Sequence, residues 1–200
     1  VGTMPMLRAR ELGIILEKAK VRIALSDFRT SEEVRLSEPS ALEHMVTYGD
    51  GVLEEMARGN PDAFETVKTS AEDVALIAFT SGTTGMPKGT MHFHRDVLAI
   101  CDCFPVSILQ ATEDDIFAGS PPLAFTFGLG GILLFPMRVR ASTVMLEKAP
   151  PPELTKACQE FGVTVVFTSP TGYRFMLDNL KDFDLSRLHK CVSAGETLPK

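Results

Sequence analysis

The strongest constraint on the fold is a nearly continuous apolar run at residues 73–80 (DVALIAFT), which leads directly into a loop of serine, glycine and threonine. An apolar run of this length, without polar alternation, is typical of a strand that is covered on both faces, as in a parallel sheet. Short apolar runs predict further strands at residues 21–25, 115–118, 143–146, 163–167 and 188–193. Helical segments separate these runs, so the sequence predicts an α/β fold of parallel sheets joined by right-handed crossovers.

The helical segments are indicated by apolar spacing and by capping residues. Apolar residues at helical spacing predict an amphipathic helix at residues 5–20. Ser169 is a candidate N-cap, with Pro170 at the first helical position of the helix that follows. Pro105 is expected to end a helix that begins near residue 92. The other predicted helices lie at residues 41–46, 52–58, 126–137 and 152–161.

The length and composition are those of a globular protein. The chain has 200 residues, of which 44% are apolar and 23% are charged. This composition excludes the disordered, collagenous and low-complexity classes. A boundary near residues 105–112 would divide the chain into a first α/β piece at residues 1–110 and a second at residues 111–200.

The charge pattern argues against a nucleic-acid partner. The net charge is −6, and residues 31–73 alone carry eleven acidic and three basic side chains. No basic run resembles a nucleic-acid or lipid patch, and the acidic stretch is interpreted as a solvated surface. The longest apolar stretch has eleven residues, at 127–137, whereas a membrane-spanning helix needs about 20. With no signal peptide, we expect a cytoplasmic protein without a membrane partner, and a homo-oligomer remains open.

The four cysteines do not indicate a metal centre. Cys101 and Cys103 follow two histidines, His92 and His94, and both residue types can bind zinc. No ligand pair has the spacing of a known zinc site. Reduced, buried thiols are the preferred interpretation, and no metal site is predicted.

The loop at residues 80–89 (TSGTTGMPKG) has the chemistry of a polyphosphate site. Glycines allow backbone N–H groups to turn inward, hydroxyls add donors, and one lysine supplies positive charge. The Walker A and Rossmann patterns are both absent, and an exposed linker is the alternative interpretation. The predicted phosphate-binding residues are Thr80, Ser81, Gly82, Thr83, Thr84, Gly85 and Lys88.

These ten residues resemble the signature of the adenylate-forming superfamily, which includes acyl-CoA synthetases, luciferases and peptide-synthetase adenylation domains. The resemblance extends to residues 3–12, to residues 120–131 (SPPLAFTFGLGG) and to residues 193–199 (SAGETLP). Within the superfamily, residues 124–130 (AFTFGLG) resemble the aryl-CoA ligases of the benzoate and 2-aminobenzoate type.

The resemblance implies a fold and a reaction. The fold would consist of two incomplete parallel-sheet α/β subdomains from the N-terminal domain of an adenylate-forming enzyme. In the reaction, a carboxylate attacks the α-phosphate of ATP, bound with Mg²⁺, and releases pyrophosphate. Coenzyme A then displaces AMP and leaves a thioester. ATP, coenzyme A and a small carboxylic acid would be substrates, and no tightly bound cofactor is expected.

The resemblance also implies two further groups of binding residues. Phe125, Thr126, Phe127 and Gly128 would surround the organic group of the acid, for which core packing is the alternative role of the two phenylalanines. Ser193, Ala194, Gly195, Glu196 and Thr197 would border the adenine and the acyl group, for which a turn at a strand end is the alternative. His94 and Arg95 are weaker candidates for contacts with phosphate or coenzyme A.

The chain contains no counterpart of the family's later motifs, among them the ribose-binding aspartate and the catalytic lysine of the C-terminal domain. We therefore interpret it as a middle portion of the large N-terminal domain, without catalytic residues and unable by itself to complete either half-reaction. Two alternatives stay open. One is a short- or medium-chain fatty acyl-CoA synthetase or a carrier-protein adenylation domain, and the other is a non-catalytic nucleotide-binding module.

Overall fold

The computed structural model describes residues 1–200 except residues 62, 81–85, 179 and 199–200. The chain forms two compact units, Val1–His94 and Arg95–Lys200. The division predicted from the sequence at residue 110 stays a prediction. Among the described residues, no helix is both long and apolar enough to cross a membrane.

The first unit contains one parallel and one antiparallel pair of strands. Its elements in chain order are α1 (Ala9–Lys18), β1 (Ile23–Asp27), α2 (Ser31–Leu36), β2 (His44–Tyr48), α3 (Val52–Arg58), β3 (Val74–Thr80) and β4 (Lys88–Phe93). Strands β1 and β2 run parallel, with Leu25 opposite Val46. The predicted strand at residues 21–25 and the predicted helix at residues 52–58 are therefore confirmed as β1 and α3.

Helix α1 is amphipathic, as its apolar spacing predicts. Leu12, Ile15 and Leu16 are buried on one face. The helix begins at Ala9, four residues later than predicted, where the Ala9 N–H donates to the Glu33 carboxylate at 2.8 Å. An acidic group at this end satisfies a free helix N–H and interacts favourably with the helix dipole.

Strand β2 corrects one sequence prediction. Residues 41–46 were expected to form a short helix, but the chain is extended from His44 to Tyr48 and pairs with β1. Val46, Thr47 and Tyr48 are residue types that favour strands. The pairing with β1 decides the outcome, because isolated helices of six residues are unstable.

Strands β3 and β4 form an antiparallel hairpin, which corrects the prediction that residues 73–80 form a covered strand of a parallel sheet. The closing pair of the hairpin is Thr80 opposite Lys88. None of the seven residues of β3 is buried. Gly89 lies opposite Phe79, and a Cβ at Gly89 would come within 3.2 Å of the Phe79 ring. The glycine therefore lets the aromatic ring lie across the partner strand.

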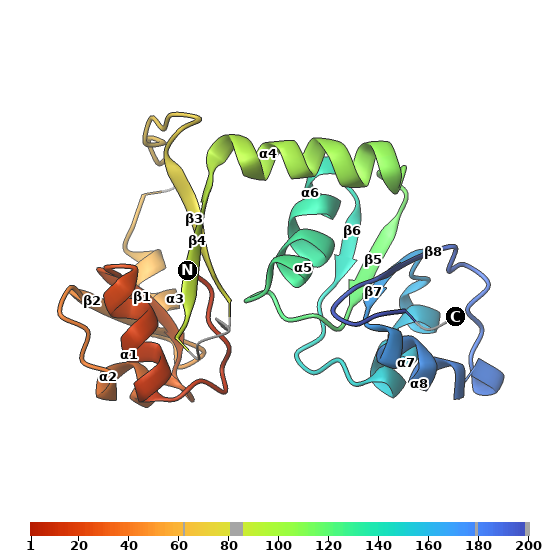
Figure 1. Ribbon diagram of the computed structural model, residues 1–200, viewed down its shortest axis with the longest axis horizontal. Coiled ribbons are helices and arrows are strands. Elements are labelled where there is room, and N and C mark those ends of the chain that lie inside the picture. The colour runs from red at the N-terminus through yellow and green to blue at the C-terminus, as the bar shows by residue number, and fades with distance from the viewer. Residues whose placement is uncertain (62, 81–85, 179, 199–200) are drawn as a thin grey trace. The chain divides into compact units, whose positions relative to one another are not determined.

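The second unit is built on a four-stranded parallel sheet in the order β6-β5-β7-β8, which confirms the predicted α/β class (Figure 1). Helix α4 begins at His94, the last residue of the first unit, and the rest of the helix belongs to the second unit. The elements in chain order are α4 (His94–Asp102), η1 (Cys103–Ile108), β5 (Ile116–Gly119), α5 (Thr126–Gly128), η2 (Leu129–Leu134), α6 (Phe135–Val139), β6 (Ser142–Val144), α7 (Pro151–Phe161), β7 (Val165–Thr168), α8 (Pro170–Asp178), η3 (Leu180–Asp182) and β8 (Lys190–Ser193).

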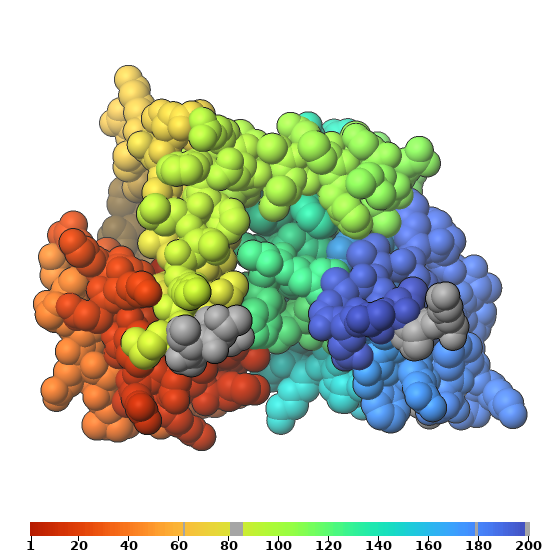
Figure 2. Space-filling model, viewed as in Figure 1, coloured from red at the N-terminus to blue at the C-terminus, as the bar shows by residue number. Residues whose placement is uncertain are grey.

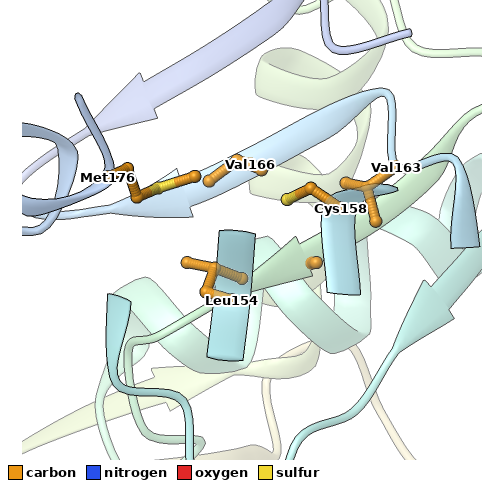
Figure 3. Close-up of a cluster of buried hydrophobic side chains, with 6 residues drawn as sticks. Leu154, Cys158, Val163, Val166 and Met176 are labelled. Atoms are coloured by element: carbon orange, nitrogen blue, oxygen red, sulfur yellow. The ribbon is translucent and has the colours of Figure 1, made fainter. Parts of the chain in front are cut away.

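Helices cover both faces of this sheet (Figure 1). On one face, Ala118 and Val166 pack against α7 and α8 in a cluster of buried side chains (Figure 3). On the other face, Phe117, Val165 and Phe167 pack against the segment from η1 to α6. Successive residues along β5 and along β7 thus point to opposite faces of the sheet, as strand geometry requires, and pack in different cores.

The helical backbone continues past Pro105, contrary to the prediction that this proline ends the helix. Helix α4 ends at Asp102, and the π-helical segment η1 follows without a break. The Leu109 N–H donates to the Phe104 carbonyl at 2.9 Å. Pro105 has no N–H to donate back to α4, and the wider i→i+5 bonding of the π-helical segment carries the helical backbone past the proline.

Candidate functional site

The predicted phosphate loop lies in the chain between the antiparallel strands β3 and β4. Thr80 ends β3 and Lys88 begins β4. The predicted contact residues Ser81, Gly82, Thr83, Thr84 and Gly85 lie outside the described residues. The sequence predicts a strand-to-helix loop, whereas the described ends of the loop are joined by antiparallel pairing.

Lys88 is available for an anion, as far as the described residues go. Its side chain is exposed, and it forms no ion pair with another described residue. Lys18, in the last turn of α1, donates from Nζ to the Pro87 carbonyl at 3.1 Å. Helix α1 therefore contacts the residue that precedes Lys88.

Phe125 is the most exposed aromatic residue of the predicted acyl-binding segment. It precedes α5 in extended conformation, and its side chain is 50% exposed. Its N–H donates to the Pro122 carbonyl at 3.0 Å, and its carbonyl accepts the Leu129 N–H at 2.8 Å. Thr126 follows as the exposed first residue of α5. Phe125 and Thr126 thus present side chains to solvent from a fixed backbone.

Phe127 and Gly128 instead belong to the interior. The Phe127 ring lies 5.6 Å from the Phe167 ring and joins the aromatic core on that face of the sheet. Gly128 is buried, and the Pro121 and Pro122 carbonyls occupy the space that a Cβ would need. Each of the two residues has a packing role in the structure, independent of any contact with a ligand.

The predicted adenine and acyl loop begins at the carboxyl end of β8. Ser193 is the last residue of the strand, and Ala194 to Thr197 follow without regular structure. Gly195 has a φ of +90°, a conformation that favours glycine. Glu196 accepts a hydrogen bond from Thr171 Oγ1 of α8 at 2.6 Å. In the space-filling view this last part of the chain, in dark blue, lies on the surface (Figure 2).

The helix α8 itself begins as the sequence predicts. The Gly172 N–H donates to Ser169 Oγ at 3.1 Å, which confirms Ser169 as the N-cap ahead of Pro170. The Tyr173 hydroxyl donates to the Val166 carbonyl at 2.7 Å. Burial raises the pKa of this phenol, so it stays protonated as a donor.

One polar pair at the same end of the sheet was missed by sequence reasoning. Ser120 Oγ and Thr168 Oγ1 lie 2.6 Å apart, where β5 and β7 end. Thr168 is 1% exposed. The two residues are 48 positions apart in the chain, so only the strand order brings them together. The available signal in the sequence was a polar residue close to the end of each of two predicted parallel strands, Ser120 and Thr168.

The cysteines and histidines form no metal cluster within the described part of the chain. All four cysteines are free; Cys101 and Cys158 are buried, whereas Cys103 and Cys191 are exposed. Burial raises the pKa of Cys158 to about 11, so its thiol is protonated at neutral pH. His94 begins α4, and its N–H donates to the Asp73 carbonyl at 3.1 Å.

The structure thus combines a parallel α/β sheet with a chain segment rich in serine, threonine and glycine at residues 80–89. The family model described as AMP-binding enzyme matches residues 1–200. The chain therefore belongs to the AMP-binding enzyme family. The resemblance to adenylate-forming enzymes drawn from the phosphate loop is confirmed.

Several of the most similar relatives are aryl-CoA ligases. A benzoate–CoA ligase of Thauera aromatica is 34% identical over 82% of this chain and 32% of its own length. A 4-hydroxybenzoate–CoA/benzoate–CoA ligase of Rhodopseudomonas palustris is 31% identical over 96% of this chain and 38% of its own length. The crystal structure of the anthranilate CoA ligase AuaEII in complex with anthranoyl-AMP has a TM-score of 0.92 and 30% identity, over 99% of this chain and 40% of that chain. The chain thus spans 32% to 40% of the length of these relatives.

Proposed function

We propose that the protein containing this chain is an AMP-forming ligase that joins an aromatic carboxylic acid to coenzyme A. The observation that carries the proposal is the likeness to AuaEII, a ligase of an aromatic acid whose structure holds an aryl adenylate. The two benzoate ligases among the relatives support the same substrate class. In this proposal, benzoate and 2-aminobenzoate are the first acids to test.

The phosphate loop would bind the β- and γ-phosphates of ATP, which enters with Mg²⁺ as a substrate. The first half-reaction brings a carboxylate anion to a polyanion, so it needs charge neutralisation and positioning more than a protein nucleophile. Lys88 would supply positive charge there, since its ammonium group is exposed and has no ion-pair partner among the described residues. Ser193 to Thr197 would border the adenine and the acyl group.

Phe125 would contact the aromatic ring of the acid. Its ring is half-exposed, whereas Phe127 packs against Phe167. An exposed aromatic side chain on a hydrogen-bonded backbone suits a flat ring, because aromatic pairs prefer offset-stacked or edge-to-face contact. Phe127 and Gly128 would contribute by fixing the backbone around Phe125.

The substrate class is tested by pyrophosphate release from ATP in the full-length protein with a panel of acids. We expect release with benzoate or 2-aminobenzoate, formation of AMP, and a thioester once coenzyme A is added. Preference for an alkanoate would replace the aryl assignment with a fatty acyl-CoA synthetase. Release of orthophosphate with ADP, or no turnover with any acid, would overturn the proposed activity itself.

The role of Phe125 is tested by the substitution Phe125→Ala in the same assay. We expect the KM for the aromatic acid to rise by about tenfold, because the lost contact is worth about 1–3 kcal/mol. Phe161→Ala is the matched control, since Phe161 ends α7 and is also 50% exposed. Equal effects of the two substitutions on the KM for the acid would remove Phe125 from the acyl site.

A further inference from the structure

We infer that Thr168 is a positioning residue for the acyl-binding segment: its buried hydroxyl holds Ser120 and so sets the place of Phe125. The inference rests on the proposed function, because it concerns the binding of the acid. Thr168 ends β7 and is 1% exposed. Its Oγ1 lies 2.6 Å from Ser120 Oγ, and the Ser120 N–H donates to the Phe167 carbonyl at 3.1 Å.

Helix α8 fixes Thr168 from the other side. A Cβ at Gly172 would overlap Thr168 Oγ1, so the absence of a side chain at residue 172 leaves room for the hydroxyl. The Gly172 N–H is itself held by Ser169 Oγ at 3.1 Å. The Thr168 hydroxyl therefore lies between a capped helix turn and Ser120, with little space to adopt another position.

The path from Ser120 to Phe125 is short and stiff. Pro121 and Pro122 follow Ser120. Each proline has a fixed φ, and Pro121 also restricts the backbone of Ser120. Their carbonyls fill the space beside Gly128, and the Pro122 carbonyl accepts the Phe125 N–H at 3.0 Å. A displacement of Ser120 is thus carried to Phe125 through proline backbone and close packing.

The position of Ser120 depends on the hydrogen bond between its hydroxyl and that of Thr168. Removing one hydroxyl leaves the other buried or half-buried without a partner, which favours a shift of Ser120. A misplacement of about 1 Å at a binding group can cost up to about a hundredfold in rate. Loss of the Thr168 hydroxyl should therefore affect the acid more than ATP.

The test compares variants of the full-length protein by the KM values for the aromatic acid and for ATP. Thr168→Val removes the hydroxyl at nearly constant volume, and Thr168→Ser keeps it. We expect Thr168→Val and Ser120→Ala each to raise the KM for the acid by about fivefold to tenfold, with the KM for ATP changed by less than about twofold. Thr168→Ser should restore the KM for the acid. The double variant should raise this KM by less than the product of the two single effects, because both substitutions remove the same hydrogen bond.

Thr164→Val is the matched control. Thr164 is also a buried threonine, and its Oγ1 donates to Asp115 at 2.7 Å at the amino end of the same sheet. We expect this control to lower the Tm without raising the KM for the acid. If Thr168→Val fails to fold, Ser120→Ala replaces it in the comparison, because Ser120 is partly exposed.

The outcomes separate the inference from the proposed function. Equal effects of Thr168→Val and Thr164→Val on the KM for the acid would overturn the positioning role. So would a Thr168→Val variant that raises both KM values by the same factor, or neither. If the unmodified protein activates no aromatic acid, the proposed function is wrong and the inference falls with it.

Discussion

Lys190 Nζ lies 2.7 Å from Asp115 Oδ2 at the amino end of the parallel sheet, and both side chains are largely buried. The same carboxylate accepts hydrogen bonds from the Thr112 N–H at 2.9 Å and from Thr164 Oγ1 at 2.7 Å. His189 Nε2 lies 3.6 Å from Asp115 Oδ1. This network joins the segments before β5, β7 and β8 at the end of the sheet opposite the candidate site.

The network predicts a loss of stability in acid. Burial by itself would raise the pKa of Asp115, but the hydrogen bonds from Lys190, Thr112 and Thr164 lower it below its usual value. Because the folded-state pKa is lower than the unfolded one, the carboxylate stabilises the protein at neutral pH. This contribution is lost as the pH falls from about 4, the usual aspartate value, through the folded-state pKa. We expect the Tm to fall in this range.

The measurement is the Tm of the wild type and of Asp115→Asn between neutral and acidic pH. Asp115→Asn should be less stable at pH 7, by about 3 kcal/mol, since it removes one partner of a buried ion pair. It should also lose less stability on acidification than the wild type. Two Tm curves that fall in parallel would show that Asp115 does not cause the acid sensitivity.

The core between the sheet and α7 predicts a large effect of one leucine. Leu154 is 1% exposed and packs with Cys158, Val163 and Val166 (Figure 3). Leu154→Ala should reduce the free energy of unfolding by about 3 kcal/mol, through lost apolar burial and the cavity that remains. Leu177→Ala on α8 is the control, because Leu177 is 63% exposed, and its effect should stay within about 0.5 kcal/mol. Urea unfolding distinguishes the two, and similar losses would contradict this view of the core.

Gly131 in η2 is expected to tolerate no side chain. A Cβ there would overlap the ring of Phe167, which is buried in the aromatic core. Gly131→Ala should destabilise the protein by about 1–3 kcal/mol, because the ring has no space to move into. Gly59→Ala is the control, since φ is −83° at Gly59 and a Cβ would make only ordinary contact. A Gly131→Ala protein as stable as the control would mean that the ring adapts.

Substitution of Lys88 distinguishes a catalytic role of the predicted phosphate loop from a structural one. In the full-length protein, Lys88→Ala should lower the rate of pyrophosphate release by about a hundredfold, as expected for the loss of one charged contact to a transition state. The Tm should change little, because the Lys88 side chain is exposed. Lys156→Ala, at another exposed lysine on α7, should leave both quantities unchanged. A fall in Tm with unchanged pyrophosphate release would instead indicate a structural loop.

The second unit was more predictable from the sequence than the first. Its central strands, β5 and β7, are short apolar runs between strong helix signals, such as the Ser169 N-cap, and both strands are largely buried. In the first unit, the sequence predicts a helix where β2 begins and no strand where β4 lies. Both strands are short and polar at one end, so their conformation depends on a partner strand rather than on local propensity.

The sequence by itself determined the class of protein, because the ten residues at 80–89 resemble the signature of the family whose model matches the chain. It also determined the layered α/β architecture, since apolar runs and helical spacing are local properties of the chain. Only the tertiary structure decided which of the predicted acyl-site residues face solvent: Phe125 is exposed, whereas Phe127 packs against Phe167. It alone paired Ser120 with Thr168 and Asp115 with Lys190. Such contacts depend on the order of strands in a sheet, and no spacing within the chain encodes that order.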